Sequence, residues 1–265
     1  MSDRCIGVIG LGNMGRGMCQ SLLREGFEVY GADLGAQQCE LAREMGVKVV
    51  ASLQELCEAT KTILLSLPAA KHVQQVVLGE SGLINTARPD TLIIDTSTSE
   101  PDVTRALAQQ LSDSGLAMLD APVSGGPAGA AAGTMVMVVG GSELSLARAM
   151  PFFEALSSKV VHLGDSGSGH AAKLINNLLC AAHLVTTAEA LALGESAGLD
   201  AAKLLEGLNA GSGRSAVSEV NFPRWILSDT FDSGFTMQLM RMSRKKKSRS
   251  VYQKIVEIIW ATRYE

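Results

Sequence analysis

Residues 5–18, CIGVIGLGNMGRGM, constrain the fold of this chain more than any other stretch. An apolar run closes at Ile9, and glycines follow at positions 10, 12 and 15, in the spacing Gly-x-Gly-x-x-Gly, before a helical pattern begins. In a strand–turn–helix unit this spacing permits a tight turn, a close approach of the backbone to a pyrophosphate, and close packing of helix on strand. The start of the helix supplies N–H groups and a partial positive charge for phosphates. The alternative is a glycine turn in an α/β domain without a cofactor. We predict a dinucleotide-binding turn made of Gly10, Leu11, Gly12, Asn13, Met14 and Gly15.

An acidic residue follows the second apolar run. Residues 27–32 have a strand pattern that ends in Asp33, at about the distance from the glycines where a ribose-binding acid is expected. A carboxylate there accepts hydrogen bonds from the ribose hydroxyls and repels a 2′-phosphate. The next residues, 34–37, contain no arginine that would offset this repulsion. We therefore expect NAD to be the cofactor, with NADP disfavoured.

Strand and helix patterns alternate along the first part of the chain. We predict strands at residues 5–9, 29–32, 62–67, 92–95, 117–119, 135–139 and 160–163. Helical patterns lie between most of them, for example at residues 14–24, 37–45 and 101–114, and two more follow at residues 171–197 and 201–208. Such alternation predicts an α/β fold, a Rossmann-type doubly wound and mostly parallel sheet, followed here by an all-helical domain.

The domain boundaries follow from where the strand patterns stop. Residues 1–164 are predicted to form the NAD-binding Rossmann domain. Residues 165–241 are predicted to form an incomplete helical domain for substrate binding and dimerisation, and residues 242–265 an aberrant basic tail.

Three predicted strand ends carry polar or glycine-rich segments, at residues 67–68, 95–98 and 120–126. Ligands of doubly wound sheets bind at the carboxyl ends of the strands. Exposed hydroxyls and glycine N–H groups suit a nicotinamide ribose and a substrate carboxylate. Taken alone, each segment is also compatible with an ordinary turn.

The segment GSGHAAKLINN, residues 167–177, opens the long helical pattern. Lys173 and Asn177 are four residues apart, so they share one helix face. A cation and an amide beside open space suit a site that holds and protonates a small oxygen-rich substrate. The alternative is a solvated surface lysine. For His170, three residues earlier, we favour a packed or surface role over a role in the site.

Composition narrows the class of protein. The net charge of −4 gives no reason to expect nucleic acid or a membrane as a partner. Five cysteines without a Cys-x-x-Cys pair read as reduced thiols, which is typical of a cytoplasmic protein. No signal peptide is visible, since the first apolar run is already the nucleotide-binding strand. The four histidines have no ligand spacing, so we predict no metal.

At this point the motifs resemble a known family, the β-hydroxyacid dehydrogenases, which include 3-hydroxyisobutyrate dehydrogenase, tartronate semialdehyde (2-hydroxy-3-oxopropionate) reductase and L-threonate dehydrogenase. The resemblance covers residues 5–241 and rests on GLGNMG at 10–15, DAPVSGG at 120–126 and GSGHAAKLINN at 167–177. It implies a hydride transfer between NAD(P) and a small 3-hydroxy acid or its semialdehyde, and a Rossmann domain joined to a helical one.

The resemblance also implies roles for single residues. Lys173 would be catalytic, and Asn177 would help to place the substrate. A lysine has an ordinary pKa of ~10.4, so its action as a base near neutral pH requires partial burial. Ser124, Gly125 and Gly126 would hold the substrate carboxylate, and Leu67, Pro68 and Thr98 would line the nicotinamide and its ribose.

Three other interpretations stay open. A 6-phosphogluconate dehydrogenase-like enzyme would place a histidine three residues after the lysine, where this chain has Asn176. An imine-reducing relative would normally lack Lys173. A folded but catalytically inactive NAD-binding protein is the non-enzyme alternative, because the C-terminal sequence departs from the family pattern.

That departure begins after Arg241. Residues 241–265 hold eight Lys and Arg but two acidic residues, which indicates a frameshifted or truncated reading of a longer gene rather than a nucleic-acid-binding tail. We expect residues 243–250, SRKKKSRS, to be disordered and Val251, Ile255, Ile258 and Ile259 to face one side of a short helix. We expect weak or no activity for this form, and a homo-oligomer if the helical domain is complete enough.

Overall fold

The computed structural model describes residues 4–228 and residue 230. It divides into two compact units, Met1–Lys173 and Leu174–Glu265. The predictions made above for residues 231–265 lie outside the described residues.

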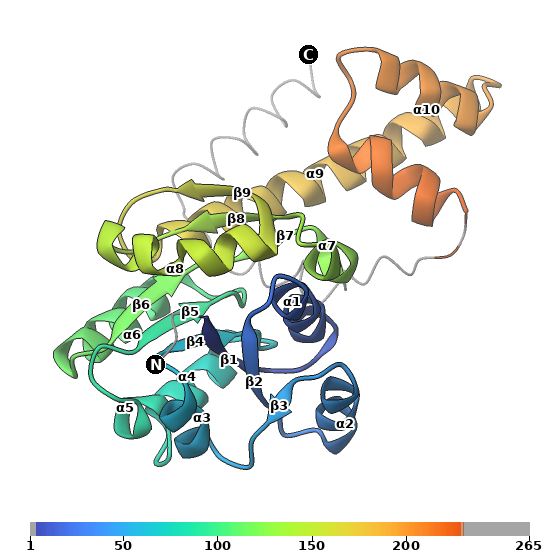
Figure 1. Cartoon of the computed structure of the whole chain (residues 1–265). Helices are drawn as coiled ribbons and strands as arrows, with labels where there is room; N and C mark the ends of the chain where they lie inside the picture. The colour runs from blue at the N-terminus through green and yellow to red at the C-terminus, as the bar shows by residue number, and fades with distance from the viewer. Residues whose placement is uncertain (1–3, 229, 231–265) are drawn as a thin grey trace. The chain divides into compact units, whose positions relative to one another are not determined.

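A six-stranded parallel sheet forms the centre of the first unit (Figure 1). Its strand order is β3-β2-β1-β4-β5-β6, so the direction of winding reverses between β1 and β4. Ligands of doubly wound sheets bind at such a switch point. The strands are β1 (Cys5–Ile9), β2 (Glu28–Ala32), β3 (Lys48–Val49), β4 (Thr62–Leu65), β5 (Leu92–Asp95) and β6 (Ala117–Asp120). The α/β fold class predicted from the sequence is therefore confirmed.

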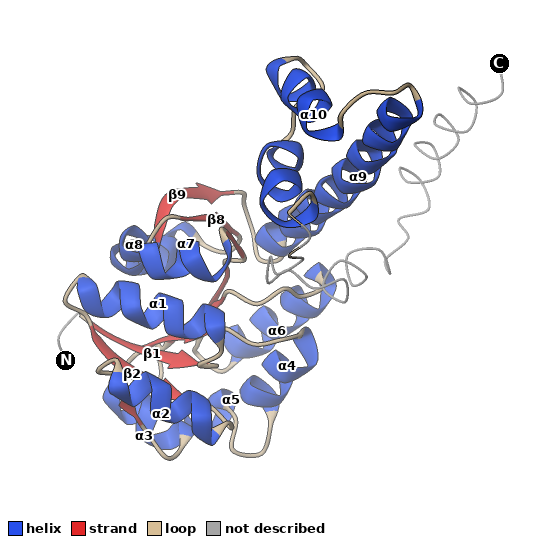
Figure 2. Cartoon of the chain, turned by 90° about the vertical axis from the view of Figure 1, so that its right-hand side faces the viewer, coloured by secondary structure: helices blue, strands red, loops and turns tan. Residues whose placement is uncertain are grey.

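Helices cover the strands of this unit (Figure 2). Two helix starts show the local sequence signals that favour them: the Ser52 hydroxyl accepts a hydrogen bond from Glu55 N at the start of α3, and Pro101 is the first residue of α6. The helices are α1 (Asn13–Arg24), α2 (Ala36–Glu44), α3 (Leu53–Ala59), α4 (Ala70–Leu78), α5 (Leu83–Thr86) and α6 (Pro101–Asp113).

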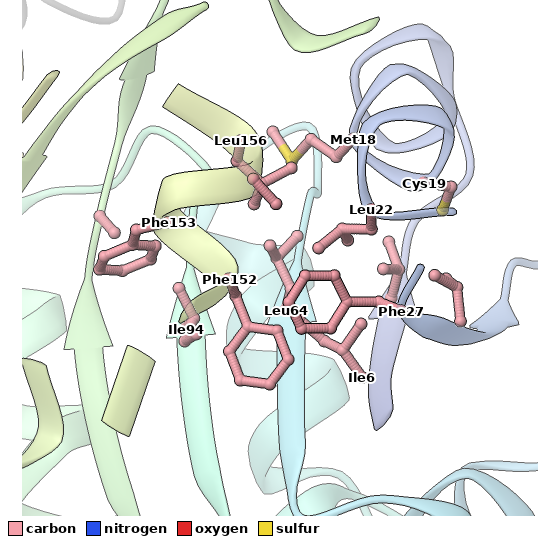
Figure 3. Close-up of a cluster of buried hydrophobic side chains, with 14 of the residues drawn as sticks. Ile6, Met18, Cys19, Leu22, Phe27, Leu64, Ile94, Phe152, Phe153 and Leu156 are labelled. Atoms are coloured by element: carbon pink, nitrogen blue, oxygen red, sulfur yellow. The ribbon is translucent and has the colours of Figure 1, made fainter. Parts of the chain in front are cut away.

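Successive strand residues point to opposite faces of the sheet and fill two separate cores. Leu64 and Ile94 belong to the core that Met18 and Leu22 of α1 complete. Figure 3 shows these side chains together with Phe27, Phe152 and Phe153. The next residues along the strands face the other core, whose members come from α3, α4, α5 and α6: Leu56, Cys57, Val73, Val77, Leu83, Leu107 and Leu111. Both faces are buried, which explains why the central strands are continuously apolar.

After β6 the chain leaves the parallel sheet and builds a second one of three strands, in the order β7-β8-β9. The sequence suggested a single sheet. The difference arises at β7, which pairs antiparallel with β8, while a bridge from Asp120 to Gly140 joins the second sheet to the end of β6. The added elements are β7 (Val123–Ser124), α7 (Gly126–Ala132), β8 (Met135–Val139), α8 (Glu143–Leu156) and β9 (Ser157–His162).

The long helix α9 (Ser168–Ser196) begins in the first unit and continues into the second. The second unit adds α10 (Ala201–Ala210) and a wide π-type helix η1 (Val217–Ile226). Its small core gathers Leu191, Leu205, Val217 and Phe222. By length and composition alone, α9 is long and apolar enough to cross a membrane. The core helix of a soluble protein can have the same length and composition.

The glycine turn yields a testable contrast in stability. A Cβ on Gly15 would lie 1.8 Å from the Gly10 carbonyl oxygen, whereas a Cβ on Gly12 would meet no atom within 4 Å. Gly15→Ala must therefore push α1 away from β1, and we expect it to lower the stability by about 1–3 kcal/mol or more. Gly12→Ala, the matched control, should lower the melting temperature far less. Calorimetry of both variants checks this, and equal melting temperatures would contradict it.

Candidate active site

The glycine turn lies between β1 and α1, at the carboxyl edge of the parallel sheet. Gly10 has a φ of 95°, and a Cβ there would lie 2.2 Å from the Ser66 carbonyl oxygen, so this position requires glycine. Gly12 precedes the first residue of α1, is exposed, and faces open space. No side chain caps α1, and its first turn contains no acidic residue. This open, uncapped helix start fits the phosphates of a dinucleotide.

Asp33 follows β2 and stands beside the glycine turn. Its Oδ2 atom accepts a hydrogen bond from Leu11 N at 2.6 Å, and its Oδ1 atom accepts one from Gly35 N at 2.7 Å. An ionised carboxylate can accept about four hydrogen bonds, so two are left for a ligand. The half-buried carboxylate is thus held in a fixed orientation next to the backbone of the glycine turn.

The segments after β4 and β5 are cross-linked. Leu67 N donates to the Ser97 hydroxyl at 3.0 Å, and Ser97 N donates to Asp95 Oδ1 at 2.9 Å. Pro68 is exposed and Thr98 is half-buried, so both have surface available to a ligand. The structure therefore places Leu67, Pro68 and Thr98 in two loops that Ser97 ties together at the sheet edge.

The predicted carboxylate-binding segment forms the end of β7 and the start of α7. Gly125 and Gly126 have φ angles of 130° and 63°, which favour glycine, and a Cβ on Gly126 would meet nothing within 4 Å. Lys173 Nζ donates a hydrogen bond to the Ser124 hydroxyl at 2.9 Å. Two motifs that are 49 residues apart in the sequence therefore meet at one point, where a cation and a hydroxyl lie beside accessible backbone.

A buried polar cluster lies behind this pair. The Asp120 carboxylate accepts hydrogen bonds from Gly167 N at 2.7 Å and from His170 N at 2.9 Å. The His170 ring lies 3.0 Å from the Ser97 carbonyl oxygen through Nε2 and 2.8 Å from the Thr104 hydroxyl through Nδ1. Asp120 and His170 are both 0% exposed. The expectation that His170 is a packed or surface residue is met by its burial.

Asp95 lies on the other side of the His170 ring, with Oδ2 3.9 Å from Nε2. This oxygen has no hydrogen-bond partner among the described residues. Burial raises the pKa of the Asp95 carboxyl above its usual range, and the neighbouring His170 and the Ser97 hydrogen bonds oppose the rise. Asp95 and Asp120 stand at predicted strand ends, but no local pattern predicts a role for either. Their partners are backbone and ring atoms that no local pattern reveals.

Asn177 belongs to the second unit, four residues after Lys173 along α9, and is 4% exposed. Its assignment to the substrate stays a prediction. No disulfide joins cysteines among the residues that the structure describes. Within residues 4–228 and 230, no group of three or more His, Cys, Asp or Glu side chains is arranged to hold a metal ion.

Two family descriptions match this chain. The first, the NAD binding domain of 6-phosphogluconate dehydrogenase, matches residues 5–164. The second, NAD-binding of NADP-dependent 3-hydroxyisobutyrate dehydrogenase, matches residues 167–242. Both descriptions name a nicotinamide dinucleotide as the ligand.

Individual proteins are similar over most of the chain. The 2-(hydroxymethyl)glutarate dehydrogenase of Eubacterium barkeri is 37% identical over 88% of this chain and 78% of its own length. The 3-hydroxyisobutyrate dehydrogenase of Pseudomonas aeruginosa is 39% identical over 89% of this chain and 81% of its own length. The solved 3-hydroxyisobutyrate dehydrogenase of Mycobacterium tuberculosis, with L-serine, has a TM-score of 0.83 and 34% identity, and the match covers 91% of this chain and 84% of that one.

Proposed function

The chain belongs to the β-hydroxyacid dehydrogenase family, and on that premise we propose that it moves a hydride between NAD and a small 3-hydroxy acid or its semialdehyde, of the 3-hydroxyisobutyrate, tartronate semialdehyde or threonate type. The observation that carries the proposal is the 2.9 Å hydrogen bond from Lys173 Nζ to the Ser124 hydroxyl. It puts the expected acid–base group beside the expected carboxylate-binding loop.

The loop offers the groups that a carboxylate needs. Ser124 supplies a hydroxyl, and the N–H groups of Gly125 and Gly126 precede and begin α7, a helix without a capping side chain. Hydrogen bonds from donors to an ionised acceptor are the stronger kind. We assign the substrate carboxylate to these three residues. A panel of 3-hydroxy acids would determine which carbon-chain length and which substituents the substrate has.

Lys173 then acts on the oxygen of the reacting carbon. In reduction, its ammonium group donates a hydrogen bond and finally a proton to the carbonyl oxygen as negative charge develops there. In oxidation, the neutral amine accepts the proton from the hydroxyl. Lys173 is half-buried and its Nζ atom is already held by the Ser124 hydroxyl. Asn177, one helical turn further along α9, is proposed to orient the substrate.

The dinucleotide is assigned to the glycine turn and to the loops joined by Ser97. Residues 10–15 would hold the pyrophosphate, Asp33 the adenine ribose, and Leu67, Pro68 and Thr98 the nicotinamide side. When bound, the nicotinamide supplies or accepts the hydride. One matching family description mentions NADP, so the choice of NAD rests on Asp33 of this chain.

A turnover assay with NAD and a panel of 3-hydroxy acids tests the proposal directly. Turnover with at least one of them, even at the weak level expected for this form, would support the proposal. Activity confined to 6-phosphogluconate or to cyclic imines would favour one of those two enzyme classes instead. NAD binding without turnover on any of these substrates would identify an inactive dinucleotide-binding protein.

Cofactor choice gives the first prediction for this site. A 2′-phosphate would approach the Asp33 carboxylate, and two like charges about 4 Å apart cost roughly 1–4 kcal/mol. We therefore expect NAD to bind about one to three orders of magnitude more tightly than NADP. Fluorescence titration measures both affinities. Asp33→Ser should narrow the gap by improving NADP binding, and equal affinities in the unmodified protein would show that Asp33 does not contact the ribose.

The role of Lys173 gives the second prediction for this site. Lys173→Met should lower kcat by about 10²-fold or more, because acid–base assistance is worth roughly 10²- to 10⁴-fold, and should leave NAD affinity nearly unchanged. Lys203→Met, an exposed lysine on α10, is the matched control and should keep the original rate. If the Lys173 variant of an active enzyme kept more than a tenth of the rate, Lys173 would not be the acid–base group.

The Ser124 hydroxyl gives the third prediction for this site. A contact with the carboxylate exists in both the bound substrate and the transition state, so Ser124→Ala should raise KM more than it lowers kcat. Loss of one hydrogen bond to a charged group predicts a change of about 10-fold to 100-fold in KM. NAD affinity should stay the same. A normal KM for the acid combined with weaker NAD binding would reassign this loop to the cofactor.

A further inference from the structure

Asp120 lies between the two segments that form the Lys173–Ser124 pair. It is the last residue of β6, and Ser124 follows four residues later at the end of β7. Its carboxylate reaches the start of α9, where it accepts hydrogen bonds from Gly167 N, just before the helix, at 2.7 Å and from His170 N, in the first turn, at 2.9 Å. Lys173 is three residues beyond His170 on the same helix. The Asp120 side chain therefore holds the start of the helix that carries Lys173, and its backbone lies four residues before Ser124.

The carboxylate does for α9 what a capping residue does for an ordinary helix. The first N–H groups of a helix have no partner within it, and a negative charge there is favoured by the helix dipole. Capping normally comes from the residue just before the helix. Here the two N–H groups are satisfied by a residue that precedes them by 47 and 50 positions, so the cap also fixes where the helix begins in space.

The backbone of two glycines packs closely against the Asp120 carboxylate. A Cβ on Gly140 would lie 2.7 Å from Oδ1, and a Cβ on Gly169 would lie 3.0 Å from Oδ2 and 2.5 Å from the Asp120 carbonyl oxygen. The Asp120 backbone is further held by a pair of hydrogen bonds with Gly140, at 3.0 and 2.8 Å. These glycines let the backbone of α9 and of the β8–α8 turn close directly onto the side chain.

The His170 ring connects the start of α9 to the loop that contains Ser97, on the proposed nicotinamide side. The Ser97 carbonyl can only accept a hydrogen bond, so the ring nitrogen Nε2, 3.0 Å away, donates. The Ser97 hydroxyl in turn accepts from Leu67 N. A continuous set of hydrogen bonds thus runs from Leu67 through Ser97 and His170 to Asp120.

From this geometry we propose that Asp120 is a positioning residue for the reaction: it sets the distance between Lys173 Nζ and the Ser124 hydroxyl by holding the first turn of α9 against the end of β6. The inference rests on the proposed function, since it concerns the same site. Asp120 touches neither of the two reacting groups and acts only through the backbone that carries them.

Asp120→Asn in the full chain tests the proposal. The amide keeps one acceptor, but its NH₂ group faces a backbone N–H, and the negative charge at the helix start is lost. A displacement of a reacting group by about 1 Å costs on the order of 10²-fold in rate, so we expect kcat per NAD-binding site to fall about 10- to 100-fold with NAD affinity unchanged. Asp200→Asn is the matched control. Its carboxylate caps α10 by accepting from Lys203 N at 2.9 Å, and the substitution should leave kcat unchanged.

A second readout does not depend on turnover. The rate at which an imidate reagent modifies Lys173, followed by mass spectrometry, reports the surroundings of its amine, and the exposed Lys61 serves as internal reference. Asp120→Asn should raise the Lys173 rate by about threefold or more, because the amine would lose its hydrogen bond to Ser124, and should leave the Lys61 rate unchanged. If the unmodified protein turned over no substrate, the proposed function would fail while this readout still decided the role of Asp120.

The proposal would be overturned if the Asp120→Asn variant melted at a lower temperature but kept both its kcat per site and its rate of Lys173 modification within about twofold of the original protein. Asp120 would then be a purely structural residue. If Asp120→Asn yields no folded protein, Thr104→Val decides instead. It removes the hydroxyl 2.8 Å from His170 Nδ1 and should change Lys173 modification in the same direction by a smaller factor. No change in that variant would also overturn the proposal.

Discussion

The capping of α9 by a carboxylate from β6 is the interaction on which the candidate site depends. A parallel sheet places the ends of its strands along one edge, but it does not by itself determine where a following helix starts. Asp120 does so here, since it accepts the N–H groups of Gly167 and His170 at 2.7 and 2.9 Å. Lys173 follows one helical turn later, and its Nζ atom donates a hydrogen bond to the Ser124 hydroxyl. The His170 ring, in the first turn, is hydrogen-bonded to the Ser97 carbonyl oxygen.

Much of this arrangement could be predicted from the sequence, because the signals are local. The continuous apolar strands and the glycine spacing gave the α/β class and the strand–turn–helix unit at residues 5–24. Motif resemblance singled out Lys173 and Ser124, and the structure brings them within hydrogen-bond distance. The start of α9 was predicted less accurately: the sequence pattern indicated residue 171, whereas the helix begins at Ser168. One physical reason is that the N–H groups of Gly167 and His170 are bonded by Asp120, a distant residue that a local pattern does not reveal.

Other features lack any periodic signal. The strands β3 and β7 have two residues each, too few for an alternating pattern, and β7 turns the chain into a second sheet at the carboxylate-binding loop. The π-type helix η1 contains Pro223, which argues against a helix in a sequence pattern. The cluster of Asp95, Asp120 and His170 was missed as a unit because its members come from three segments and are completed by backbone atoms.

A crystal structure of the ternary complex with NAD and an unreactive 3-hydroxy acid analogue tests the central claim most directly. The account predicts that the analogue's carboxylate lies on Ser124 and the N–H groups of Gly125 and Gly126. It also predicts that its hydroxyl oxygen lies about 3 Å from Lys173 Nζ, the distance that proton transfer requires. A carboxylate bound elsewhere, or a Lys173 side chain directed into solvent while the analogue occupies the site, would contradict it.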